Sequence, residues 1–185
     1  RYVCVESPHT REIEEVANSA GAELLEREVY LASPIAADVI MMVNVLHHIP
    51  FADIPRQLNV LLNSLRPDGT IIIHEMGELR TPEKKNVPWL SVDITNLLQF
   101  NGIFVNPRST TSKSGVPISH TIISVQSVTD FTPSLITQTR SIWKQMKERV
   151  LKEIDSIYKC NDKSDQIRLQ HLLIINANLD LNRPQ

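Results

Sequence analysis

The chain has 185 residues, which is close to the size of one globular domain, and 42% of them are hydrophobic. Its formal net charge of -2 at pH 7 gives no field that would attract nucleic acid or another polyanion. Because no run approaches the roughly 18 apolar residues of a membrane span, no signal peptide is visible and the two cysteines stand far apart, we expect a soluble domain in a reducing, cytoplasmic compartment.

The first 37 residues predict two short strands around a helix. Arg1–Glu6 is a brief apolar run that ends in an acid, as a buried strand does at its carboxyl end. Thr10–Ala20 has an apolar stripe at helical spacing and is followed by Gly21, a typical helix stop. Glu23–Tyr30 predicts a further strand, and the loop Leu31–Ala37 after it contains no acid.

Residues 38–75 have the pattern of a βαβ crossover. Asp38–Asn44 and Thr70–His74 are uninterrupted β-rich runs, typical of strands buried on both faces of a parallel sheet. Between them, apolar residues recur at helical spacing from Ile54 to Leu65, and the sequence Pro-Asp-Gly then predicts a turn into the second strand.

Beyond this crossover the pattern is less regular. Met76–Lys85 is polar, Val92–Phe100 predicts a helix, and two apolar runs follow at Ile103–Val105 and Ser119–Val125. The connection between these runs, Asn106–Pro117, contains proline and glycine among small polar residues, so we expect it to be mobile.

The last part of the chain is predicted to be helical. Pro133–Tyr158 carries an apolar face that includes Ile136 and Trp143, and Lys163–Ala177 predicts a second helix. Two interpretations remain open for this pair: it packs on the preceding domain, or it covers a substrate or binds a partner. Basic residues on the first helix are matched by acids, so nucleic-acid binding gains no support.

Three short sequence segments resemble those of the class I S-adenosylmethionine (SAM)-dependent methyltransferases, particularly the small-molecule branch. They are Ala37–Ile40, Asn44–Ile49 and Leu65–Thr70, in this order and spacing. The resemblance implies an α/β fold with a Rossmann-like, mostly parallel sheet, an antiparallel hairpin near its end and C-terminal helices. Residues 1–128 would form a partial methyltransferase-like domain, and residues 129–185 a helical extension packed on it.

The resemblance also implies a cofactor site for SAM. Glu6, followed by Ser7, matches the acid that accepts hydrogen bonds from the ribose hydroxyls, a task that suits a carboxylate at the end of a parallel strand. Asn44, Val45 and Leu46 match the floor beneath the methionine part of the cofactor.

Four further residues are candidates for the reaction itself. His47 or His48 could act as a general base, since the unperturbed pKa of histidine lies near neutrality, although in the family this pair is mostly architectural. His74 and Glu75 are expected on the substrate side, where they would orient an acceptor; ordinary solvation of a strand end is the alternative. The sequence has no metal-ligand cluster, and we expect no metal.

The family's glycine-rich loop, G-x-G-x-G, is absent. The five glycines of the chain stand one at a time, and Arg1 falls directly in what resembles the second strand of the fold. We therefore expect the first strand and its helix to lie elsewhere, supplied by another chain or segment. In the family the first strand lies between the second and the fourth, so these 185 residues alone should not bind SAM and should be unstable or aggregation-prone.

Two functions remain open on this evidence. The first is methyl transfer from SAM to a small-molecule acceptor by the parent protein, with this chain alone inactive. The second is a catalytically inactive, methyltransferase-like scaffold or protein-interaction subunit. The acceptor itself is not indicated by any part of the sequence.

Overall fold

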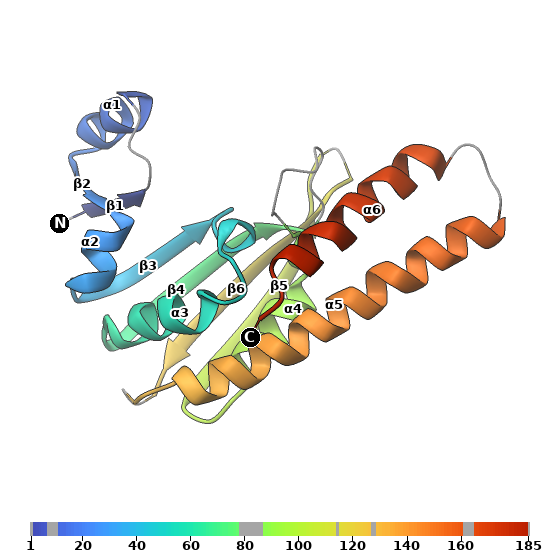
Figure 1. Cartoon of the computed structure of the whole chain (residues 1–185). Coiled ribbons are helices and arrows are strands. Elements are labelled where there is room, and N and C mark those ends of the chain that lie inside the picture. Colours follow the sequence, from blue (N-terminus) through green and yellow to red (C-terminus); the bar gives the residue numbers. More distant parts are fainter. Residues whose placement is uncertain are drawn as a thin grey trace.

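The computed structural model describes residues 2–6, 11–77, 87–113, 115–126, 129–160 and 165–184. Strands and helices alternate up to β5, β6 follows β5 directly, and two helices complete the described part of the chain (Figure 1). In chain order the elements are β1 (Tyr2–Glu6), α1 (Arg11–Ser19), β2 (Ala22–Glu26), α2 (Arg27–Ala32), β3 (Ala37–Val43), the 3-10 turn η1 (Leu46–His48), α3 (Ile54–Asn63), β4 (Leu65–Met76), α4 (Ser91–Leu98), β5 (Ile103–Thr111), β6 (Pro117–Val125), α5 (Thr132–Cys160) and α6 (Gln166–Leu181).

The larger sheet has four strands in the order β3-β4-β6-β5. The β3–β4 pair is parallel, as the predicted crossover requires, and places Val43 beside His74. The β4–β6 and β5–β6 pairs are antiparallel, so the expected hairpin is confirmed. The expectation of a mostly parallel sheet is wrong: this sheet is mixed and mostly antiparallel, because it contains a single parallel pair.

A second parallel pair, β1–β2, forms its own two-stranded sheet, in which Glu6 lies beside Glu26. Among the described residues no strand joins β1 to β3, so β3 stands at the edge of the larger sheet. Alternate side chains of β3 are correspondingly open to solvent: Val39 is 56% exposed, Met41 65% and Val43 50%. Apolar side chains on a strand edge with unpaired backbone groups are a recognised site for pairing with another strand.

Two local predictions are wrong. The strand predicted over Glu23–Tyr30 ends at Glu26, and the chain continues as helix α2, in which the consecutive residues Tyr30 and Leu31 are both buried. Neighbouring residues of a strand point to opposite faces, so burial of both favours the helix. The strand predicted over Ile103–Val105 is too short, since β5 runs from Ile103 to Thr111, and the Ser112 amide beyond it donates a 2.8 Å hydrogen bond to the Val116 carbonyl.

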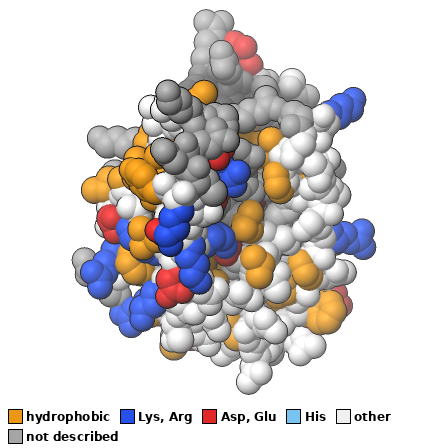
Figure 2. All heavy atoms as spheres, turned by 90° about the vertical axis from the view of Figure 1, so that its right-hand side faces the viewer, with side chains coloured by type: hydrophobic (Ala, Val, Ile, Leu, Met, Phe, Trp, Pro, Cys, Tyr) orange, Lys and Arg blue, Asp and Glu red, His pale blue; other side chains and the backbone are white. Residues whose placement is uncertain are grey.

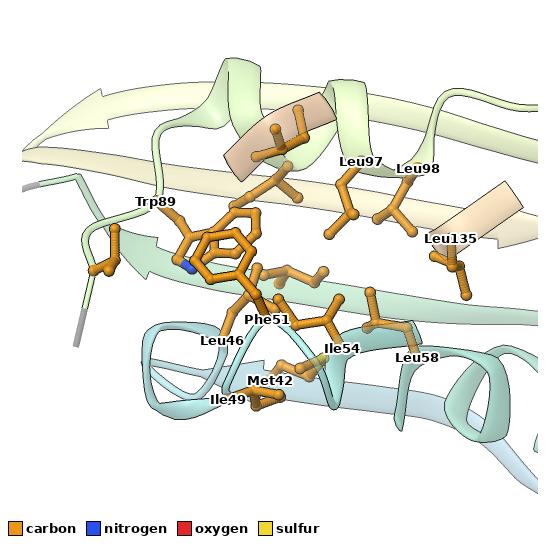
Figure 3. Packing of buried hydrophobic residues seen from close by; sticks show 14 of the residues in the cluster. Met42, Leu46, Ile49, Phe51, Ile54, Leu58, Trp89, Leu97, Leu98 and Leu135 are labelled. Carbon is orange, nitrogen blue, oxygen red and sulfur yellow. The ribbon is translucent and has the colours of Figure 1, made fainter. Parts of the chain in front are cut away.

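One face of the larger sheet carries the core. Side chains from α3, α4 and α5 meet those of β3, β4 and β6 there, and the Phe51 and Trp89 rings stack with their centroids 5.4 Å apart (Figure 3). Burying an aliphatic or aromatic side chain of this size contributes about 1.5–3 kcal/mol. The largest fully buried side chains are Trp89, Phe131, Leu46, Ile54, Leu58, Leu62, Ile71, Ile73, Ile94, Leu97, Leu98 and Ile123.

The long helix α5 contacts α3, α4 and α6. Its buried stripe is formed by Leu135, Ile142, Met146 and Val150. Met146 and Val150 belong to the predicted face and are buried as expected, whereas Ile136, at one edge of that face, is 37% exposed.

Trp143, also on the predicted face of α5, is partly buried and packs against the core. Its indole Nε1 donates a 2.8 Å hydrogen bond to the Leu179 carbonyl of α6.

The end of the molecule that faces the viewer in Figure 2 carries acidic and basic side chains interspersed with apolar ones, rather than a patch of one sign. Ion pairs join side chains of opposite sign on α5 and α6: Arg168 pairs with Glu153, and Lys159 with Asp155. None of the helices in the described ranges has the length and hydrophobicity to cross a lipid bilayer.

Candidate functional site

The candidate site begins where β3 ends. Asn44 follows the strand in a left-handed backbone conformation, with φ of 53°, which asparagine adopts more readily than most residues. Its amide donates a 2.8 Å hydrogen bond to the His74 carbonyl on β4. Its side-chain oxygen Oδ1 is buried and has no hydrogen-bond partner within the described part of the chain. An unpaired buried acceptor costs about 1–3 kcal/mol, so Asn44 offers an acceptor that a ligand's N–H group could satisfy.

The Glu75 carboxylate fixes the turn that follows. Glu75 is fully buried on β4, where it accepts a 2.5 Å hydrogen bond from the Leu46 amide and a 2.8 Å hydrogen bond from His47 Nδ1. His47 is itself only 7% exposed. With Glu75 ionised, Nδ1 carries the ring proton and Nε2 is left as an acceptor. A carboxylate that accepts a hydrogen bond from one ring nitrogen fixes the orientation of the imidazole, as proton transfer at the other nitrogen requires.

His48 lies against the ring of His47, whereas His74 is separated from this pair. His48 is exposed, and its ring centroid is 4.1 Å from that of His47. His74 lies on the opposite face of β4 from Glu75, because successive strand residues alternate between faces. There its Nδ1 lies 3.2 Å from Nδ1 of His120, its cross-strand partner on β6.

The expected cofactor residues differ in how far the structure describes them and in how exposed they are. Glu6 ends β1, but its side chain lies outside the described residues, as does the whole of Ser7. Val45 is 36% exposed, whereas Leu46 is fully buried in the core. The Leu46 side chain is therefore committed to packing, and its amide to Glu75. Among the described residues no group of three or more His, Cys, Asp or Glu side chains could hold a metal ion.

Sequence reasoning missed a hollow of about 240 Å³ beside the carboxyl end of β4. It is lined by Gly77, Leu90, Ser91, Val92, Ser109, Pro117, Ile118 and Ser119. A second hollow, of about 410 Å³, lies between the end of α4 and the start of β5 and includes Gln99 and Phe104. The residues of the first hollow come from segments far apart in the chain, so no local pattern in the sequence signals it.

No protein-family model matches the chain, and no curated protein matches it. Solved structures do. The mitomycin 7-O-methyltransferase MmcR superimposes with a TM-score of 0.52 at 21% identity, covering 68% of this chain and 42% of that one. A SAM-dependent methyltransferase from Methanosarcina mazei gives a TM-score of 0.49 at 13% identity, over 68% of this chain and 81% of that one. A putative O-methyltransferase from Klebsiella pneumoniae gives a TM-score of 0.45 at 19% identity, covering 68% of this chain and 60% of that one.

The chain thus spans less than half the length of the mitomycin enzyme. At these identities the comparison concerns the fold alone. The resemblance expected from the three sequence segments is confirmed for the fold: the chain has the fold of SAM-dependent small-molecule O-methyltransferases.

Proposed function

We propose that this chain is part of a SAM-dependent methyltransferase that methylates a hydroxyl group of a small molecule. The observation that carries the proposal is the His47–Glu75 pair, held at the shared carboxyl end of β3 and β4. In open α/β sheets, ligands bind outside the carboxyl ends of parallel strands. The solved mitomycin enzyme of the same fold is, by its name, an O-methyltransferase.

His47 would take the proton of the acceptor hydroxyl at Nε2, while Glu75 stabilises the imidazolium that results. SAM, when bound, supplies the electrophilic methyl group. The remaining contribution of the protein is alignment of the acceptor oxygen, which converts a bimolecular encounter into an intramolecular one.

The residues that would hold SAM are Glu6, Asn44 and Val45. Asn44 fits the group, since none of the described residues donates to its buried Oδ1 and the methionine end of SAM carries an ammonium group. Glu6 ends a parallel strand, where a carboxylate can accept bonds from two vicinal ribose hydroxyls. Val45, which follows Asn44 in the chain, presents an exposed apolar side chain.

The proposal includes a partner segment. A strand–turn–helix segment supplied by another chain or segment would pair its strand between β1 and β3, cover the exposed side chains Val39, Met41 and Val43 with its helix, and bring a glycine-rich turn to the cofactor. The same open edge favours the second candidate function, a scaffold that binds a partner strand without catalysis. A methyl-transfer assay distinguishes the methyltransferase from the scaffold.

The test is methyl transfer to small phenols, measured with methyl-labelled SAM. The protein used would be this chain joined to a strand–turn–helix segment with a G-x-G-x-G loop from a solved methyltransferase of this fold. We expect His47→Ala to lower kcat by about 10²–10⁴-fold, the range of general-base catalysis, and Glu75→Gln to lower it as well. His171→Ala, on α6, is the matched control and should leave kcat unchanged. Full activity of His47→Ala would remove the proposed base.

A further inference from the structure

Helix α6 is apolar on two opposite sides. The side that packs against α5 buries Leu172 and Leu179, and the Asn176 and Leu179 carbonyls accept hydrogen bonds from Lys147 and Trp143 of α5. Figure 1 shows the two helices side by side, beyond the strands of the larger sheet. A helix that is hydrophobic all round is normally buried on every side. The side of α6 that points away from α5 is therefore a candidate contact surface.

The exposed side of α6 is a stripe at coiled-coil spacing. Its members follow one another at intervals of three and four residues and form what we call the outer stripe: Ile167, Gln170, Ile174, Ala177 and Leu181. This is the a/d pattern of a helix that packs along another helix. The outer stripe lies opposite the buried side, because Ile174 follows Leu172 by two positions, or about 200° of helix rotation.

The outer stripe carries no charge. The charged residues of α6 are Arg168 and Asp180, and they pair with Glu153 and Lys147 of α5, respectively. Burying a charge without a partner is strongly unfavourable. A partner surface with charged residues is therefore disfavoured at the outer stripe, whereas a second copy of this chain presents the same uncharged stripe.

The charge at the end of α6 favours an antiparallel pair of copies. In an antiparallel pair centred on Ile174, Ile167 of one copy lies beside Leu181 of the other. Asp180 then flanks the first turn of the other α6, where the helix dipole favours a negative charge. In a parallel pair the two Asp180 side chains, each 60% exposed in the single chain, would approach each other and repel. The antiparallel pair also has the two-fold symmetry typical of homodimers.

The exposed apolar area suits a weak dimer. Ile167 is 68% exposed, Leu181 67% and Ile174 40%, and Leu173 at the edge of the outer stripe is 43% exposed. Together these side chains expose roughly 400 Å², which is large for one patch on a monomer. Two copies with their flanking residues would bury roughly 1,000 Å², the lower limit of specific interfaces. Such a dimer should form and dissociate reversibly.

We infer that α6 joins two copies of this chain through the outer stripe, as an antiparallel pair of helices. The inference goes beyond the proposed function, because the interface requires neither SAM nor methyl transfer. It is also independent of the open edge of β3, which lies on another element.

Sedimentation equilibrium of this chain, from low micromolar to near-millimolar concentration, measures the association. Ile174→Glu places two like charges at the centre of the interface, and Ile167→Glu places a charge beside Asp180 of the other copy. Val92→Glu on α4, where the parent side chain is 54% exposed, is the matched control. Met41→Lys on β3, where the side chain is 65% exposed, distinguishes pairing at the sheet edge from pairing through α6. Far-ultraviolet circular dichroism checks that each variant keeps the native secondary structure.

We expect a reversible dimer of the parent chain. Ile174→Glu and Ile167→Glu should each weaken dimerisation about tenfold or more, while Val92→Glu and Met41→Lys leave it unchanged. Because Ile167 is already largely exposed, Ile167→Glu keeps the test valid if Ile174→Glu does not fold.

A mixture of Ile174→Glu and Ile174→Lys should dimerise again, because opposite charges then meet at the centre of the interface. The inference would be overturned by a parent chain that stays monomeric, by a dimer that survives both glutamate substitutions on α6, by a mixture that stays monomeric, or by a dimer that only Met41→Lys abolishes.

Discussion

Replacing Asp93 with alanine should cost this chain about 2–4 kcal/mol of unfolding free energy. Asp93 lies in the first turn of α4 and is 1% exposed. Its carboxylate accepts two hydrogen bonds from Arg149 of α5, at 2.9 and 2.8 Å, and one of 3.0 Å from the Leu90 amide. The residue therefore caps one helix and ties it to another.

The magnitude follows from these contacts. Breaking a buried ion pair costs about 3–5 kcal/mol, but the Arg149 side chain is 37% exposed and can be rehydrated once it is released. That lowers the loss from the pair to about 1.5–3 kcal/mol. Losing the cap at the Leu90 amide adds about 1 kcal/mol, and the better helix propensity of alanine returns at most about 0.7 kcal/mol.

Urea denaturation at low micromolar protein concentration, followed by circular dichroism, measures the difference. Asp155→Ala is the control, because Asp155 pairs with Lys159 across one helical turn with both side chains more than half exposed. Exposed pairs of this kind contribute under about 0.5 kcal/mol. The assigned role of Asp93 would be refuted if the two variants lost nearly the same unfolding free energy. We set that limit at a difference of about 0.5 kcal/mol, the size of an exposed ion pair.

Three further outcomes are expected. Glu6→Ala, in the protein joined to a glycine-rich segment, should weaken SAM binding by about 1.5–3 kcal/mol by calorimetry; an unchanged Kd removes Glu6 from the site. Trp143→Ala should cost about 2–3 kcal/mol on unfolding, less than a fully buried tryptophan, because the ring is partly buried and its Nε1 bonds to α6. Hydrogen bonds from the Thr132 hydroxyl and amide hold the pKa of Asp130 below its ordinary 3.8, so its stabilising effect should be present above that pH and be lost as pH falls through the lowered pKa; carbon-detected NMR titration should show a midpoint below 3.8, raised in Thr132→Val.

The crossover from β3 to β4 could be predicted from sequence because its signals are local. Two continuous apolar runs, an intervening helical spacing and a Pro-Asp-Gly turn each depend on neighbouring residues. The pairing of His47 with Glu75 could not be predicted in the same way. The two residues are 28 positions apart, and their contact depends on the register that sets Val43 beside His74.

The failures have the same origin. The apolar residues of α2 are compatible with a strand by composition. The segment is a helix, in which the adjacent residues Tyr30 and Leu31 are both buried. The prediction of a mostly parallel sheet was wrong because the number of parallel pairs depends on which strands are neighbours in the sheet, and not only on where the strands lie in the sequence. The three serines of the hollow lie on α4, β5 and β6 and meet only in the folded chain.

SAM titration by calorimetry tests the central claim most directly, with this chain measured alone and again after joining it to a strand–turn–helix segment with a G-x-G-x-G loop. The account predicts no measurable binding by the chain alone and micromolar binding by the joined protein, weakened when the glycines of the loop are changed to alanine. A monomeric chain that melts cooperatively and binds SAM with micromolar affinity by itself would contradict the account, as would a folded joined protein that does not bind SAM.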